Sequence, residues 1–168
     1  MSLIETDLSK ELESMKIDTI DNKKILYFSL NVRDTNFILL ILKQYYEDYE
    51  IDQYKLNENF HCTLLYVGGK ENVNVDELLP FDGTNCTIIV NSIAKSDDFI
   101  VLGILSIINE NGSDLPYFGN PIKHITIGLN KTKKLSPVNS PSAFTAEGAF
   151  KSEVLFHLKA VVSIVSKK

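Results

Sequence analysis

The stretches His61-Cys62-Thr63-Leu64 and His124-Ile125-Thr126-Ile127 carry one pattern: histidine, any residue, threonine, then an aliphatic residue. The chain has only three histidines, and two of them stand in this pattern. Residues i and i+2 of a β-strand face the same way, so each stretch should present an imidazole and a hydroxyl side by side. The residues that alternate with them are apolar or cysteine. The pattern therefore predicts two strands, each with one buried face and one functional face.

Two such pairs at one anionic group would supply what hydrolysis of a phosphodiester needs without a metal. Histidine titrates near neutral pH, so one imidazole can accept a proton from water while the other donates one to the leaving oxygen. Hydroxyl groups can donate hydrogen bonds to the phosphate oxygens as these gain charge. We expect His61 and His124 to share the acid and base roles, in either assignment. We expect Thr63 and Thr126 to hold the phosphate.

Other roles for these residues fit the sequence less well. A zinc site at the two histidines would need a third ligand, and no Cys or His cluster supplies one at a familiar spacing, so we expect no metal and no cofactor. Cys62 adjoins His61 and should face the opposite side of the strand, where it packs as a small hydrophobe rather than acting as a nucleophile. His157 lacks the pattern and is predicted to be structural or on the surface.

Length and composition favour one domain over residues 1–168, with two similar lobes. Hydrophobic residues make up 44% and charged residues 23% of the chain, which is typical of a soluble globular protein. The two cysteines make no disulfide scaffold, and we find neither a signal peptide nor an apolar run long enough to span a bilayer. We expect a monomer in the reducing cytoplasm, with the nucleus as the alternative.

Charge is distributed unevenly along the chain. Residues 1–120 hold 9 Lys or Arg and 20 Asp or Glu, whereas residues 121–168 hold 8 Lys and 2 Glu. The basic part contains the second motif, and local positive potential attracts phosphate groups. Lys123 and Lys131 are therefore candidate substrate contacts, although a solvated loop would give the same pattern. The net charge of −5 argues against coating long duplexes and favours RNA 3′ ends or small nucleotides as partners.

Hydrophobic periodicity predicts two helices and six or seven strands, in an order that is mixed rather than alternating. This content indicates an α+β fold with antiparallel sheet. The predicted helices cover 3–15 and 34–49, and the predicted strands cover 24–32, 60–67, 87–94, 99–105, 123–129 and 153–165. A four-residue hairpin loop is predicted at 95–98. Loops are predicted at 109–121 and 131–142, and a short irregular or helical segment at 71–82.

Aromatic side chains near the motifs are candidates for recognising a base, because a terminal nucleotide commonly stacks on an aromatic ring. Tyr66, Tyr117 and Phe118 are the candidates we single out, and each could pack in the core instead. Tyr27 and Phe28 are further aromatic candidates. Ser29 and Asn31 could face a cleft if the first strand borders it.

The two motifs resemble the paired His-x-[Ser/Thr]-hydrophobic signature of the 2H phosphoesterase superfamily. The resemblance implies a bilobal 2H-phosphoesterase fold, with two antiparallel sheets around a central cleft and helices outside. It also implies metal-independent attack on cyclic or 2′-linked phosphates. HITIGLNKTKKLSPVNS (124–140) is similar to the second motif and following loop of the cyclic phosphodiesterase domain of fungal and plant tRNA ligases. Those domains open RNA 2′,3′-cyclic phosphates to 2′-phosphates. We expect no kinase or ligase domain beside the motifs, so the resemblance does not imply a role in tRNA splicing.

We therefore expect a 2′,3′-cyclic phosphodiesterase that acts in RNA processing or repair and leaves a 2′-phosphate. One alternative is a hydrolase of 2′-5′ oligoadenylates or of cyclic-oligonucleotide signals. Another is a nucleotide-binding module without catalysis. A module that only binds has no need of paired proton donors, so the intact His and Thr at all four motif positions favour an enzyme.

Overall fold

The computed structural model describes residues 24–167, so the helix predicted at 3–15 lies outside the described residues. The helical elements are α2 (Thr35–Tyr45), α3 (Asp48–Ile51) and the 3₁₀ helices η1 (Leu79–Phe81) and η2 (Pro137–Phe144). The strands are β1 (Ile25–Val32), β2 (Tyr54–Leu56), β3 (His61–Tyr66), β4 (Asn85–Lys95), β5 (Phe99–Asn109), β6 (His124–Asn130) and β7 (Phe150–Ser166).

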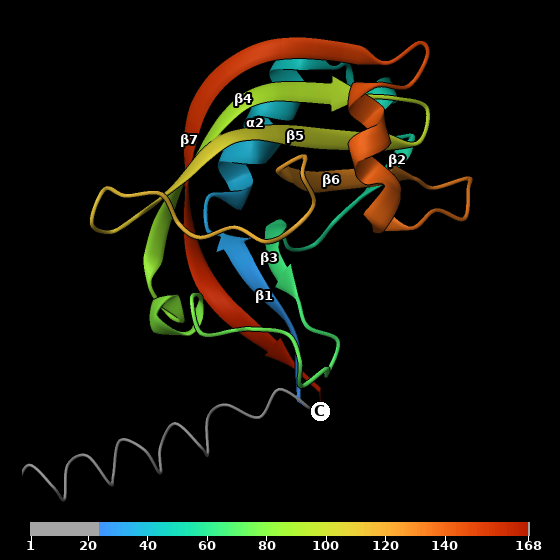
Figure 1. Ribbon diagram of the computed structural model, residues 1–168. Coiled ribbons are helices and arrows are strands. Elements are labelled where there is room, and N and C mark those ends of the chain that lie inside the picture. Colours follow the sequence, from blue (N-terminus) through green and yellow to red (C-terminus); the bar gives the residue numbers. More distant parts are fainter. Residues whose placement is uncertain (1–23, 168) are drawn as a thin grey trace, which may run out of the picture.

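The strands form a sheet in the order β2-β6-β5-β4-β7-β1-β3, and every pairing between them is antiparallel. The α+β class and the antiparallel pairing predicted from the sequence are confirmed. Helix α2 lies behind β4 and β5 in Figure 1 and contributes Ile38 and Leu42 to the main core. Within residues 24–167, no helix is both long enough and apolar enough to cross a bilayer.

The two separate sheets implied by the resemblance are not what the structure contains, because hydrogen bonds join the seven described strands into one sheet. The cause is the length of β7, which has 17 residues and pairs with β4 along its first part and with β1 along its last part. Figure 1 shows β7 as a long curved band along the molecule. A shift of register between Val90 and Ser92 of β4 accompanies this curvature. One curved sheet therefore takes the place of the two separate sheets.

The curvature brings together two strands that stand far apart in the order of pairing. β3 is the last strand of the sheet and β6 is the second, yet the two contact each other. The Asn57 amide, in the chain leading to β3, donates to the Ile127 carbonyl of β6 at 2.8 Å. Cys62 and Ile125, one from each strand, are at most 1% exposed and belong to the same core. The motif residues that alternate with them therefore face away from this core.

Two predicted elements differ in detail. The helix predicted over 34–49 stops at Tyr45, because Tyr46 is extended and a capping box between Glu47 and Glu50 starts α3. The loop predicted over 131–142 contains η2, which begins at Pro137, where the fixed φ of proline suits a first helical turn. Its Ser140, Pro141 and Ala143 are buried, so tertiary packing holds a helix where the prolines indicated a loop.

Candidate active site

A cleft of about 1180 Å³ opens between β3 and β6 and is also lined by β1, by the chain before β3, by residues 117–120 and by the start of η2. All four motif residues, His61, Thr63, His124 and Thr126, line it. Four aromatic candidates, Tyr27, Tyr66, Tyr117 and Phe118, line it as well, whereas Lys123 and Lys131 do not. The structure therefore brings the two motifs, which lie 63 residues apart in the chain, to the same cleft.

The two imidazoles are supported in the same way. His124 Nδ1 lies 2.7 Å from the carbonyl oxygen of Ile122, and His61 is hydrogen-bonded to the backbone of Asn59. In both cases the partner is the residue two positions earlier in the chain. A carbonyl can only accept, so it holds the proton of a neutral His124 on Nδ1 and leaves Nε2 to exchange protons.

Burial lowers the pKa of both histidines below its usual range, and the hydrogen bonds to the backbone partly oppose this effect. The charge of His124 lowers the pKa of His61 further. Protonation of one ring therefore disfavours protonation of the other. A pair with one protonated and one neutral ring is the state that general acid and base catalysis by two histidines requires.

The two threonines are held from different sides. Thr126 Oγ1 lies 2.6 Å from Ser140 Oγ of η2, and Ser140 is fully buried. Thr63 shares the cleft face of β3 with His61, and residue 119 packs against its carbonyl oxygen. The sequence did not single out Ser140. The signal that could have found it is the small polar residue that ends the stretch 124–140 used for the resemblance.

Strand β1 places two polar side chains beside the first motif. Asn31 is opposite His61 and Ser29 is opposite Thr63 in the register of β1 and β3. Ser29 Oγ donates to Asn31 Oδ1 at 2.9 Å, and Asn31 Nδ2 donates to Ser163 Oγ at 2.7 Å. Asn31 lines the cleft, whereas Ser29 is buried. This chain of hydrogen bonds fixes a polar wall next to His61.

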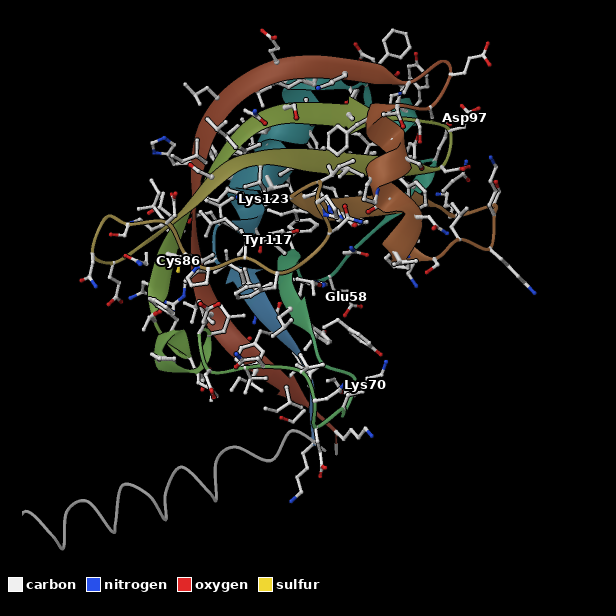
Figure 2. All side chains as sticks on the ribbon, in the orientation of Figure 1. Glu58, Lys70, Cys86, Asp97, Tyr117 and Lys123 are labelled. Atoms are coloured by element: carbon white, nitrogen blue, oxygen red, sulfur yellow. The ribbon has the colours of Figure 1, made fainter. Side chains whose placement is uncertain are left out.

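The aromatic candidates differ in how freely they meet the cleft. Tyr66 is 68% exposed and Phe118 is 46% exposed, so each has an open face. Tyr117 is half-buried and donates its hydroxyl to the Asn120 carbonyl at 2.6 Å. Figure 2 shows Lys123 beside Tyr117, and its ammonium nitrogen lies 5.3 Å from the ring centroid. Lys123 thus contacts the Tyr117 ring and does not line the cleft.

Other cleft residues came only from the structure. Lys55 lines the cleft from β2, and Asn57 and Glu58 line it from the chain after β2, where Glu58 is labelled in Figure 2. Asn57 Nδ2 donates to the Thr126 carbonyl at 2.8 Å, which ties this segment to the second motif. Lys131 is exposed just after β6, where its amide donates to the Gln53 carbonyl.

The remaining histidine and the motif cysteine lie outside the cleft lining. Cys62 is 1% exposed and burial raises the pKa of its thiol to about 12, which fits the predicted packing role. His157 is exposed on β7, in agreement with its predicted surface position. Over residues 24–167, no group of three or more His, Cys, Asp or Glu side chains is placed to hold a metal ion.

No protein-family model and no curated protein sequence matches this chain. Among solved structures, it is similar to the crystal structure of a fungal RNA kinase, with a TM-score of 0.53 and 14% sequence identity. The similarity covers 83% of this chain and 45% of the fungal chain. The chain therefore spans less than half the length of that protein, and at this identity the similarity shows a shared fold.

Proposed function

We propose that this protein is a phosphodiesterase that hydrolyses 2′,3′-cyclic phosphates at RNA or nucleotide ends to 2′-phosphates by two-histidine acid and base catalysis. The observation that carries the proposal is the meeting of both His-x-Thr pairs in one cleft. Each pair contributes an imidazole held by a backbone hydrogen bond and a hydroxyl on the same strand face. This set supplies the two proton transfers and the anion contacts that the reaction requires.

In the proposed reaction, a water molecule attacks the phosphorus of the cyclic phosphate. One histidine accepts the proton of that water as the new P–O bond forms. The bond from phosphorus to the ribose 3′ oxygen breaks, and the second histidine donates its proton to that oxygen. The product carries a 2′-phosphate and a free 3′-hydroxyl. Proton exchange with solvent then restores the two rings, and either histidine can take either role.

The threonines and the cleft residues support binding of the phosphate. Donors fixed at the oxygens that gain charge are a large source of rate enhancement, and we assign this role to Thr63 and Thr126, which line the cleft. Thr126 Oγ1 and Ser140 Oγ share a hydrogen bond in which either hydroxyl can donate, and when Ser140 donates, the Thr126 hydroxyl hydrogen is free to point at the substrate. Lys55 adds a cation at the cleft wall. The threonines and Lys55 act on the substrate phosphate through hydrogen bonding or charge, whereas Ser140 acts through Thr126.

Two observations favour RNA as the substrate class. The cleft volume of about 1180 Å³ exceeds the roughly 300–1,000 Å³ typical of small-ligand pockets, which leaves room for more than one nucleotide. The fungal protein with a similar fold is named as an RNA kinase. Its kinase activity is not part of the proposal, because this chain corresponds to less than half of it and contains no Gly-rich loop of the P-loop type.

The test is turnover of a short RNA that ends in a 2′,3′-cyclic phosphate, measured in EDTA. We expect a product that resists a phosphatase specific for 3′-phosphates. His61→Ala and His124→Ala should each lower the rate by about 10²–10⁴, the contribution of one proton transfer. The control is His157→Ala, which removes the one histidine that is exposed on β7 away from the cleft. Full activity in both motif variants would contradict the mechanism.

The size of the cleft also favours a second candidate, a hydrolase of 2′-5′ oligoadenylates or cyclic oligonucleotides. These substrates use the same two proton transfers but carry nucleosides on both sides of the phosphate. Turnover of 2′-5′ oligoadenylate without turnover of the cyclic phosphate would select this candidate. Nucleotide binding without turnover of either substrate would instead indicate a binding module.

A further inference from the structure

Residues 117–122, which we call the strap, connect the two histidine motifs across the cleft. Just before the strap, the Leu115 amide donates to the Ile107 carbonyl of β5 at 2.9 Å. The chain then reaches β3, where the Phe118 amide donates to the Leu64 carbonyl at 2.8 Å. It returns to β5 where the Lys123 carbonyl accepts from the Ile104 amide at 3.0 Å. Figure 1 shows this part of the chain crossing the front of the molecule before it enters β6.

One end of the strap is fitted tightly against the first motif. A Cβ atom added to Gly119 would lie 2.5 Å from the Thr63 carbonyl oxygen and 2.8 Å from the Tyr117 hydroxyl. Carbon and oxygen atoms do not approach this closely without displacement of the backbone. Only glycine therefore lets the strap reach this position on β3, directly beside His61 and Thr63.

The other end of the strap holds the ring of the second motif. The carbonyl of Ile122 is the hydrogen-bond partner of His124 Nδ1. The position of Ile122 is set in turn by Asn120, whose Oδ1 accepts from the Ile122 amide at 2.8 Å. The Asn120 carbonyl accepts from the Tyr117 hydroxyl at 2.6 Å. A series of contacts thus runs from the Thr63 backbone through the strap to the His124 imidazole.

We propose that the strap is a positioning element that sets the spacing of the two motifs and the tautomer of His124, with Gly119 and Asn120 as its positioning residues. The kinetic part of this inference rests on the proposed function, whereas the tautomer part does not. A shift of the strap away from β3 would move the Ile122 carbonyl and release the proton on Nδ1. Both the geometry of attack and the fraction of His124 with a free Nε2 would then change.

The first experiment compares Gly119→Ala with Gly112→Ala. Gly112 lies in the same connection between β5 and β6, and a Cβ there would meet nothing within 4 Å, although its φ of +82° adds some strain. We expect Gly119→Ala to lower kcat on the cyclic-phosphate RNA by about 10- to 100-fold, because a misplacement near 1 Å has effects of this size. Gly112→Ala should keep the kcat of the unmodified protein.

The second experiment reads the tautomer directly from the imidazole nitrogen chemical shifts of His124, without substrate. We expect the Nδ1–H form in the unmodified protein and in Gly112→Ala, and a mixture of tautomers in Gly119→Ala. Asn120→Ala should give the same mixture, whereas Asn120→Ser keeps an oxygen acceptor for the Ile122 amide and should restore the Nδ1–H form. These Asn120 variants add no bulk, so they decide the matter if Gly119→Ala does not fold.

An unchanged His124 spectrum in both Gly119→Ala and Asn120→Ala would overturn the inference. A changed spectrum in a protein that turns over no cyclic phosphate would support the strap while removing the proposed reaction, so the two failures are distinguishable. If Gly119→Ala changed kcat no more than Gly112→Ala does, the strap would not set the spacing of the motifs.

Discussion

Removal of the Ser140 hydroxyl should weaken catalysis through Thr126 alone. Ser140 Oγ is fully buried and lies 2.6 Å from Thr126 Oγ1, so Ser140→Ala removes one hydrogen bond and leaves the Thr126 hydroxyl free to rotate. A neutral hydrogen bond contributes about 0.5–1.5 kcal/mol, which corresponds to a roughly 2- to 13-fold fall in kcat/KM. Thr126→Ala removes the donor to the phosphate itself, a charge-assisted bond of about 1.5–3 kcal/mol, or roughly 13- to 160-fold.

The decisive assay is a double-mutant cycle on the cyclic-phosphate RNA. If Ser140 acts only by orienting Thr126, Ser140→Ala should cost nothing more in a Thr126→Ala background, and the coupling energy should equal the full effect of Ser140→Ala. Ser142→Ala is the control, because Ser142 is an exposed serine in the same η2 helix. Additive effects of the two substitutions, or no effect of Ser140→Ala, would refute this reasoning.

Three further outcomes follow from the electrostatics and the packing. Removal of the His124 charge by His124→Gln should raise the pKa of His61, measured by NMR titration of its ring; an unchanged or lower pKa contradicts the charge interaction. Because both histidine pKa values lie below the unfolded value of about 6.5, the unfolded chain binds more protons below that pH. Stability should therefore be full above pH 6.5 and fall as the pH drops towards the folded pKa values. Urea unfolding at pH 7.5 and 5.0 measures this loss, and it should shrink in the double variant with glutamine at both positions. Gly103→Ala should destabilise the fold by about 1–3 kcal/mol in thermal unfolding, because its Cβ would overlap Ser92 Oγ. Ser92→Ala in the same chain should recover most of the loss, and an equal loss in both proteins would show that Ser92 is not the obstacle.

Much of the fold was predictable from local patterns. The alternation in both motifs predicted that Cys62 and Ile125 face the core, and both are at most 1% exposed. The strands other than β2, and the antiparallel hairpin at 95–98, followed from apolar runs and turn residues, although the structure extends β4 to Lys95 and so shortens the loop. The short strand β2 (Tyr54–Leu56) was not predicted. The break at Tyr46 was missed, because the apolar stripe continues across the capping box that starts α3.

The cleft was less predictable, because the residues that join the two motifs there are brought in by strand pairing and packing between distant parts of the chain. Asn31 faces His61 only through the pairing of β1 with β3, and Asn57 reaches Thr126 only because β2 pairs with β6. Ser140 meets Thr126 through a 3₁₀ helix that its prolines do not by themselves predict. The sequence suggested Asn31 only as a residue that could face a cleft, and it signalled Ser140 only as the small polar residue that ends the stretch 124–140. Asn57 is marked by neither a local period nor a motif.

The sequence by itself determined which side chains share a strand face, because neighbouring residues of a strand alternate with a fixed period of two. Each imidazole could therefore be placed beside a hydroxyl without any knowledge of how the strands pair. Only the tertiary structure decided that the two pairs meet, through one curved sheet that brings its last strand, β3, into contact with its second strand, β6. The meeting of the two pairs depends on the curvature of β7 and on the strap beside Thr63. Both features are set by packing between residues that lie far apart in the chain.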